Sequence, residues 1–441
     1  MAYDVIVVGG GFAGIRAARD LAAAGLAVVL FEGGDRLGGR AYTRASRLFP
    51  EIQVEIGGAY LERHHHPRLA GELDRYGVVT APAPEATVFR NRLGPGNHDS
   101  AFPIPGEEAT AVETGVYRML RDAHRIDITV GLENQGLDDL DIPLIDYVDT
   151  LGLGPVSRQL VLSWSWNMLG QHPSKSSALW ALQQVAAHGY SALGVVLSLD
   201  EIVPAGIGQL VAAMASDVPE IVLGARVTSV DRQEDGTHDV VVARGGVIER
   251  HRATHVVIAT PFNTWRNIEV DPPLPPVRAA AVAQGHACRG LKLLIHVSGV
   301  PEGVSCTGDG VFPTVYDYMG TPDGGRFLVA FTDSESFDPT DADAVAAAVQ
   351  YYVPEAVVHG SEYYDWAADP LFGGPWVSPY IGQFTRIHKG LGEPHGDMLF
   401  IGSDVSLQFP GYIEGALETA DAAVTRILGG ALERRTAAAQ V

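Results

Sequence analysis

Cysteine is scarce in this chain of 441 residues, which contains only Cys288 and Cys306. Two cysteines cannot form a disulfide framework, and these two lack the spacing of a metal site. No uninterrupted apolar run reaches about 18 residues, so no membrane-spanning helix is expected. The first predicted strand begins near Tyr3, which leaves no room for a signal peptide. We therefore expect a protein of the reducing cytoplasm.

Positive charge is also in deficit. The chain has 31 Lys and Arg against 53 Asp and Glu, a formal net charge of −22. Nucleic acids and anionic membranes require a basic surface, so neither is expected as a partner. Hydrophobic residues at 46% and charged residues at 19% are typical of a globular protein. At about 150 residues per domain, the length predicts two or three domains.

Glycine, in contrast, is abundant and occurs at a defined spacing near the start of the chain. An apolar run, Val5 to Val8, leads into Gly9, Gly11 and Gly14, and a helix is expected from about Phe12 to Ala24. Gly9 permits the tight turn, Gly11 lets a pyrophosphate approach the backbone, and Gly14 lets the helix lie close to the strand. This pattern predicts a β-α-β unit that binds a dinucleotide.

The identity of the dinucleotide is narrowed by Glu32, which ends the second apolar run, Ala27 to Phe31. A carboxylate at this position can accept hydrogen bonds from both ribose hydroxyls. It would repel a 2′-phosphate, so NADP is disfavoured.

Two further glycine clusters favour FAD over NAD. One spans Gly33 to Arg40 and ends in Gly38-Gly39-Arg40, which suits close contact with phosphate oxygens and a charge-assisted hydrogen bond. The other, Gly57-Gly58, follows a predicted strand and suits backbone that lies flat against a planar ligand. Together they indicate a ligand with a longer contact surface than NAD.

Three other segments allow more than one interpretation. His64-His65-His66 could bind a metal, but three adjacent histidines cannot all face one ion, so a polar loop before a helix at Pro67 to Tyr76 is favoured. The segment Trp164 to Met168 reads as a core helix with a satisfied Asn167. Lys292 is the single charge in an apolar strand, so it is either an edge residue or a buried functional one.

The C-terminal part contains a second ligand-facing turn. Leu399 to Asp404 reads as a strand and a glycine turn, and the segment after Pro410 opens a helix whose N-terminus can point at a ligand. Asp404 could hold a ribityl hydroxyl or cap the loop.

These elements, in this order, resemble one family across nearly the whole chain. The unit with Glu32 and Gly38-Gly39-Arg40, the Gly57-Gly58 pair, Lys292, Trp376 and the signature from Gly402 to Ala416 match the flavin-containing amine oxidases of the monoamine oxidase type. Stretches such as WNMLGQ and GSDVSLQFPGYIEGALETA resemble a bacterial branch of this family that oxidises a hydroxypyridine alkaloid in nicotine degradation.

The resemblance implies a mixed α/β fold of the monoamine oxidase type. A Rossmann-like FAD-binding domain would be assembled from residues 1–80, 205–290 and 385–430. A discontinuous substrate-binding domain of mixed sheet and helices would comprise 81–204, with a helical insertion, and 291–384. The tail, 431–441, is expected to be frayed.

The resemblance also implies roles for individual residues. Lys292 would hold a water against flavin N5, and Trp376 and Tyr412 would stand on either side of the substrate amine. Asn167 and Tyr316 would contact the hydroxypyridine end, with Tyr60 and Phe331 in the same wall. The residues expected to bind FAD are Gly9, Gly11, Phe12, Ala13, Gly14, Glu32, Gly33, Gly39, Arg40, Gly57, Gly58, Ala59, Val227, Trp376, Gly402, Ser403, Asp404, Tyr412 and Ile413.

The chain departs from the family pattern at three places. Members with a covalent flavin have Cys where this chain has Pro375, so FAD is expected to bind non-covalently. The usual Gly-Gly-Gln-Trp is Gly57-Gly58-Ala59-Tyr60 here, which changes the pocket wall. Asp404 replaces a Glu and is one methylene shorter.

The expected activity is hydride transfer from the carbon next to a secondary or tertiary amine to flavin N5, with O2 as acceptor and H2O2 as product. A small-molecule amine, oxidised at the C–N bond of a pyrrolidine ring, would be the substrate, and a homodimer is suggested. One alternative is oxidation of another secondary amine or a polyamine. Another, of a different class, is a binding protein without redox activity, as in the GDP-dissociation inhibitors. An amino-acid oxidase would need an arginine for the substrate carboxylate, and no candidate is apparent.

Overall fold

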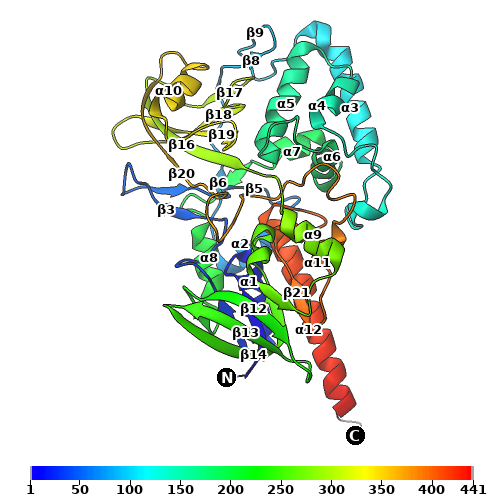
Figure 1. Cartoon of the computed structure of the whole chain (residues 1–441). Coiled ribbons are helices and arrows are strands. Elements are labelled where there is room, and N and C mark those ends of the chain that lie inside the picture. Colours follow the sequence, from blue (N-terminus) through cyan, green and yellow to red (C-terminus); the bar gives the residue numbers. More distant parts are fainter. Residues whose placement is uncertain (1, 439–441) are drawn as a thin grey trace.

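Two large sheets and a group of helices make up the protein (Figure 1), seen in a computed structural model that describes residues 2–438. The helices are α1 (Phe12–Ala23), α2 (Pro67–Tyr76), α3 (Ala109–Ala123), α4 (Leu144–Thr150), α5 (Pro155–Leu169), α6 (Ala178–Ala187), α7 (Ala192–Leu197), α8 (Gly208–Ala215), α9 (Pro276–Gln284), α10 (Ala342–Gln350), α11 (Lys389–Gly392) and α12 (Ile413–Ala438). The helix expected at Pro67 to Tyr76 is confirmed.

The first sheet contains the predicted β-α-β unit. Its strands, in spatial order, are β11 (Ile221–Val222), β2 (Val28–Phe31), β1 (Ala2–Val8), β14 (Val247–Ile258), β13 (His238–Arg244), β12 (Arg226–Arg232) and β15 (Glu269–Asp271), and β21 (Met398–Phe400) pairs with β14. β1 pairs in parallel with β2 and β14, and β14 pairs in parallel with β21. The carboxyl ends of these four strands therefore meet at one edge, where nucleotides bind in such sheets.

The second sheet is mainly antiparallel, in the order β20 (Val357–Tyr363), β16 (Gly290–Ser298), β19 (Arg326–Asp333), β18 (Thr314–Gly320), β17 (Val304–Thr307) and β7 (Val88–Phe89). Three small sheets contain β5 (Tyr60–Leu61), β10 (Glu201–Ile202) and β6 (Ala81–Pro82); β3 (Thr43–Ala45) and β4 (Gln53–Glu55); and β8 (Arg92–Leu93) and β9 (Gly96–Asn97).

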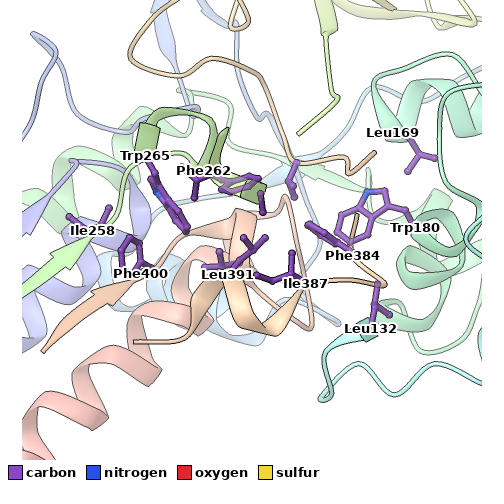
Figure 2. Packing of buried hydrophobic residues seen from close by; sticks show 14 of the residues in the cluster. Leu132, Leu169, Trp180, Ile258, Phe262, Trp265, Phe384, Ile387, Leu391 and Phe400 are labelled. Carbon is purple, nitrogen blue, oxygen red and sulfur yellow. The ribbon is translucent and has the colours of Figure 1, made fainter. Parts of the chain in front are cut away.

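Alternation along β1 explains how the first sheet is covered on both faces. Val5 and Val7 pack with residues of α1, α8 and α12, whereas Ile6 and Val8 pack in a second cluster on the opposite face. That second cluster is continuous with the helical group. Figure 2 follows it from Phe400 at the sheet to Trp180 on α6. The nucleotide-binding sheet and the helices α3 to α6 thus share one hydrophobic core.

The C-terminal helix α12 continues to Ala438. The tail 431–441 was expected to be frayed, but it is helical as far as Ala438 because α12 continues past Gly430. Residues 439–441 lie outside the described residues. No helix among residues 2–438 is both long and apolar enough to cross a membrane. The domain boundaries given above stay a prediction.

Candidate active site

One cavity of about 350 Å³ runs from the carboxyl edge of the first sheet to the second sheet and the helical group. All the residues expected to bind substrate or take part in catalysis line it, and so do all those expected to bind FAD except Gly14. Segments separated by hundreds of residues are therefore brought together. Their individual roles are taken up as proposals below.

The glycines after β1 shape the end of the cavity at the first sheet, which is called the nucleotide end below. A Cβ on Gly14 would lie 1.9 Å from the Gly9 carbonyl oxygen, so Gly14 does not face the cavity but allows α1 to lie against the strand. A Cβ on Gly11 would have only the Gly39 Cα within 4 Å, at 3.9 Å, so this backbone is open for a ligand to approach. No side chain caps α1, so its first N–H groups remain available to phosphate oxygens.

The carboxylate of Glu32 is fixed at the end of β2. Its two oxygens accept hydrogen bonds from the backbone N–H of Gly10 and of Gly34, each 2.6 Å long. The side chain lines the cavity beside Val227 of β12. This arrangement holds a carboxylate where a ribose would lie, and it fits the ADP half of FAD.

Arg40 and Asp404 form an ion pair further along the cavity. Arg40 Nη2 donates to Asp404 Oδ1 at 2.7 Å and to Ser403 Oγ at 3.0 Å, and the Phe262 backbone N–H donates to Asp404 Oδ2 at 2.9 Å. Burial alone would raise the pKa of the Asp404 carboxyl, but Arg40, His286 and these hydrogen bonds hold it below its usual range. Asp404 thus keeps its negative charge, and it fixes the Arg40 guanidinium in the cavity wall.

Lys292 is a buried residue rather than an edge residue. Its side chain is only 6% exposed, and Nζ donates to the Gly57 carbonyl oxygen at 3.1 Å. Burial lowers the pKa of the Lys292 ammonium to about 8, and the carboxylate of Glu55 partly opposes this effect. A lysine with this pKa exchanges its proton near neutral pH, which is typical of functional sites.

Strand register places Lys292 beside the aromatic wall. Lys292 lies directly opposite Phe331, which in turn lies opposite Thr314, two residues from Tyr316. Side chains alternate along strands, so Lys292, Phe331 and Tyr316 project from the same face of the second sheet. The ring centroids of Tyr316 and Phe331 are 6.1 Å apart, and those of Tyr316 and Tyr60 are 6.4 Å apart.

Trp376 and Tyr412 form the other walls of this end. Trp376 Nε1 donates to the Met168 carbonyl oxygen at 3.0 Å, which fixes the indole. A Cβ on Gly170 or on Gly290 would lie within 3 Å of that indole, so both positions must be small. A Cβ on Gly411, the residue before Tyr412, would lie 3.5 Å from Trp376 Cβ.

The histidine segment packs against Tyr412. His66 is buried, and its ring centroid lies 5.3 Å from that of Tyr412, while His65 Nδ1 lies 3.0 Å from a Glu62 oxygen. Among residues 2–438, no three His, Cys, Asp or Glu side chains come together so that they could hold a metal ion.

Asn167 and Tyr316 are joined directly. Asn167 Nδ2 donates to the Tyr316 hydroxyl oxygen at 3.3 Å. Burial raises the pKa of Tyr316 to about 12, so it remains a neutral hydroxyl and can donate a hydrogen bond. The pair presents the Asn167 carbonyl and the Tyr316 O–H to the cavity, one acceptor and one donor.

Several residues of the cavity wall were not predicted from the sequence. Two groups of them stand out: Trp180, Gln184, Ser198 and Leu199 on and after α6, and Trp366, Pro370, Leu371 and Phe372 before the Gly373-Gly374 turn. The only sequence signal for the first group was a pair of amides, Gln183 and Gln184, on an otherwise apolar helix. The second group follows a strand directly, and a Cβ on Gly33 would lie 3.2 Å from the Leu371 side chain.

Comparison with known proteins identifies the family. The sequence pattern described as flavin containing amine oxidoreductase matches residues 12–428, nearly the whole chain. This chain belongs to that family. The predictions of a flavin amine oxidase fold of mixed α/β type, of an oxidoreductase and of FAD as the cofactor are thereby confirmed.

Within the amine oxidoreductases, the chain is 61% identical to the (S)-6-hydroxynicotine oxidase of Paenarthrobacter nicotinovorans over 426 residues, which cover 97% of this chain and 99% of the relative. It is 29% identical to a pseudooxynicotine dehydrogenase of a Pseudomonas species, over 95% of this chain and 84% of that relative.

Solved structures of this family share the fold at lower identity. The structure of a putrescine oxidase bound to putrescine superposes with a TM-score of 0.85 at 23% identity, covering 97% of this chain and 99% of that chain. Cyclohexylamine oxidase from Brevibacterium oxydans has a TM-score of 0.82 at 20% identity, with 96% and 98% covered.

Proposed function

We propose that this protein is an FAD-dependent oxidase of (S)-6-hydroxynicotine that acts in nicotine degradation. The observation that carries the proposal is the 61% identity to an (S)-6-hydroxynicotine oxidase over 97% of the chain. The bond oxidised would be the C–N bond of the pyrrolidine ring, and the cyclic iminium product would open in water to 6-hydroxypseudooxynicotine. The cytoplasmic location and the homodimer stay predictions.

The substrate end of the cavity has the chemistry that this molecule requires. Asn167 and Tyr316 offer an acceptor and a donor to the hydroxypyridine ring. Tyr60 and Phe331 give flat apolar surface for the same ring. We assign Asn167, Tyr316, Tyr60 and Phe331 to substrate binding.

Trp376 and Tyr412 would orient the amine between two electron-rich rings. Burial raises the pKa of the Tyr412 hydroxyl, so it carries no charge that would stabilise an ammonium. The amine can therefore bind as the neutral form, whose lone pair stabilises the developing iminium. No strong protein base is needed for that step.

The other end of the cavity fits FAD. The pyrophosphate would be held by Arg40 and by the turn with Gly9, Gly11, Phe12 and Ala13, and the ribose would be held by Glu32. The same cavity is lined by the remaining predicted contacts: Gly33, Gly39, Gly57, Gly58, Ala59, Val227, Gly402, Ser403, Asp404 and Ile413. When bound, the flavin accepts the hydride and passes two electrons to O2, which gives H2O2. Lys292 would supply a positive charge beside the site of O2 reduction.

Pro375 has no nucleophilic side chain, so we infer that FAD binds non-covalently. Acid precipitation of the protein should therefore release the flavin into the supernatant.

Polyamine oxidation is the second candidate, and the cavity argues against it. The only carboxylates of the described chain that line the cavity are Glu32 and Asp404, and both lie at the nucleotide end. A polyamine carries a distant second ammonium group, which would be left unpaired in an aromatic wall. A binding protein without redox activity would lack flavin, so a yellow purified protein would rule out that alternative.

The test is a peroxide-release assay on the purified holoprotein with (S)- and (R)-6-hydroxynicotine, (S)-nicotine and putrescine. We expect peroxide first and fastest with (S)-6-hydroxynicotine. Faster release with putrescine, or none with either enantiomer of 6-hydroxynicotine, would refute the proposal.

A further inference from the structure

The carboxamide of Gln184 lies in the cavity wall without a protein partner. Gln184 is on α6, is only 6% exposed, and lines the cavity. Its side chain makes no hydrogen bond within residues 2–438, although its backbone carbonyl accepts one from His188. Buried amides in folded proteins are nearly always hydrogen-bonded, so this one needs an explanation.

The other buried glutamines of the described chain show what is usual here. Gln183 Nε2 donates to the Leu407 carbonyl oxygen at 2.7 Å, Gln171 Nε2 to Ser378 Oγ at 2.8 Å, and Gln383 Nε2 to the Gly285 carbonyl oxygen at 2.7 Å. None of these three lines the cavity. Gln183 Oε1 also has no partner, but among the four described buried glutamines Gln184 alone makes no side-chain hydrogen bond and lines the cavity.

Helix α6 fixes where this amide lies along the cavity. Trp180, four residues earlier, is on the same face of the helix, and its ring centroid lies 5.2 Å from that of Phe384 (Figure 2). Leu169, which follows Asn167 on α5, lies near Trp180 in the same view. Four residues later, the ring of His188 lies 5.4 Å from that of Tyr412. Gln184 therefore lies between Trp180 and His188 along α6, in the wall of the cavity that Asn167 and Tyr412 also line.

We propose that Gln184 is a specificity-determining residue whose carboxamide hydrogen-bonds the hydroxypyridine ring of the substrate. A 6-hydroxypyridine in its pyridone form presents one N–H donor and a C=O acceptor with two lone pairs. Asn167 and Tyr316, which make one hydrogen bond to each other, offer that ring one acceptor and one donor. The second lone pair of the ring oxygen is therefore left for the Gln184 NH2 group.

The amine is not the partner of this amide. A neutral tertiary amine has no N–H to donate to the Gln184 carbonyl oxygen. A hydrogen bond from the Gln184 NH2 to the amine lone pair would withdraw the electrons that hydride transfer requires. The ring oxygen is the part of the substrate that gains from the Gln184 NH2 donor.

The inference rests on the proposed function, and its test compares Gln184→Leu with the matched variant Gln183→Leu. We expect Gln184→Leu to lower kcat/KM for (S)-6-hydroxynicotine about tenfold and that for (S)-nicotine less than twofold, because nicotine lacks the ring oxygen. The inhibition constant of 2-hydroxypyridine, the ring without the amine, should rise by a similar factor. Gln183→Leu should change both substrates equally.

Flavin absorbance and the melting temperature show whether each variant is folded and binds FAD. If Gln184→Leu loses FAD, Gln184→Met is tested in its place. An equal loss for both substrates, or an unchanged inhibition constant, would overturn the role of Gln184 while leaving the proposed function intact. A wild-type protein that does not oxidise 6-hydroxynicotine would overturn both.

Discussion

The two ends of the cavity are built from different materials. The nucleotide end consists of glycine backbone and fixed charges: Glu32 is held by two backbone N–H groups, and Arg40 is paired with Asp404. The substrate end consists of aromatic rings and uncharged amides, with Lys292 as its one cation among the described residues. In our proposal, a cofactor common to many enzymes would be bound by backbone geometry and charge. The substrate would be selected by side chains that can change without disturbing that geometry.

The largest loss of stability and of FAD binding is expected from a substitution at Gly14, where the backbone of α1 contacts the turn after β1. Gly14→Val would push a Cβ to within 1.9 Å of the Gly9 carbonyl oxygen, and α1 would have to move from β1. We expect a loss of about 3 kcal/mol or more of stability and loss of bound FAD, measured by denaturant unfolding and flavin absorbance. Gly71→Ala is the control, since a Cβ there meets nothing within 4 Å on α2. Normal FAD binding by Gly14→Val would show that the turn is less constrained than the structure indicates.

Lys292→Met should have the next largest effect. Removing the only cation of the substrate end should slow the reaction of reduced enzyme with O2 about a hundredfold, while FAD stays bound. In the wild type this rate should fall as the pH rises through about 8, because the Lys292 ammonium then loses its proton. The variant should lack that titration. Stopped-flow reoxidation across pH decides the matter, and a variant that reoxidises at the wild-type rate would remove Lys292 from the mechanism.

Asn167→Ala and Tyr316→Phe should act on the substrate end alone. Each should lower kcat/KM for (S)-6-hydroxynicotine about tenfold, which corresponds to about 1.4 kcal/mol, with a smaller effect on (S)-nicotine. The double variant should lose less than the sum of the two, because the residues are bonded to each other. Equal losses on both substrates would mean that the pair is structural.

Trp376→Phe should have the smallest effect. The ring remains, but the hydrogen bond to the Met168 carbonyl is lost, so we expect kcat/KM to fall only a few-fold. Trp166→Phe is the matched control. This change removes the 2.9 Å hydrogen bond from Trp166 Nε1 to Asp333, which lies away from the cavity wall. It should therefore alter stability but not kcat/KM. Indistinguishable kinetics for the two variants would show that the orientation of Trp376 is unimportant.

The same contrast explains what could be predicted from the sequence. Gly9, Gly11, Gly14 and Glu32 are adjacent in one β-α-β unit, so local spacing fixes their geometry. Residues such as Asn167 and Tyr316 lie 149 positions apart and meet only through packing of α5 on the second sheet. Spacing carries no information about such pairs, and resemblance to the family supplied them.

Gln184 was predicted neither by local spacing nor by resemblance to the family. It carries no motif, and two adjacent amides, Gln183 and Gln184, on an otherwise apolar helix read as satisfied core residues until the cavity beside them is known. The extent of α12 was also not predicted: the tail 431–441 was expected to be frayed, yet the helix continues to Ala438.

The most direct test is to mix the holoprotein with (S)-6-hydroxynicotine without oxygen and follow the visible absorbance of the flavin. We expect rapid and complete bleaching, with slower bleaching by (S)-nicotine and none by putrescine at the same concentration. An oxidised flavin spectrum that persists with (S)-6-hydroxynicotine would contradict the assignment of this cavity to that substrate.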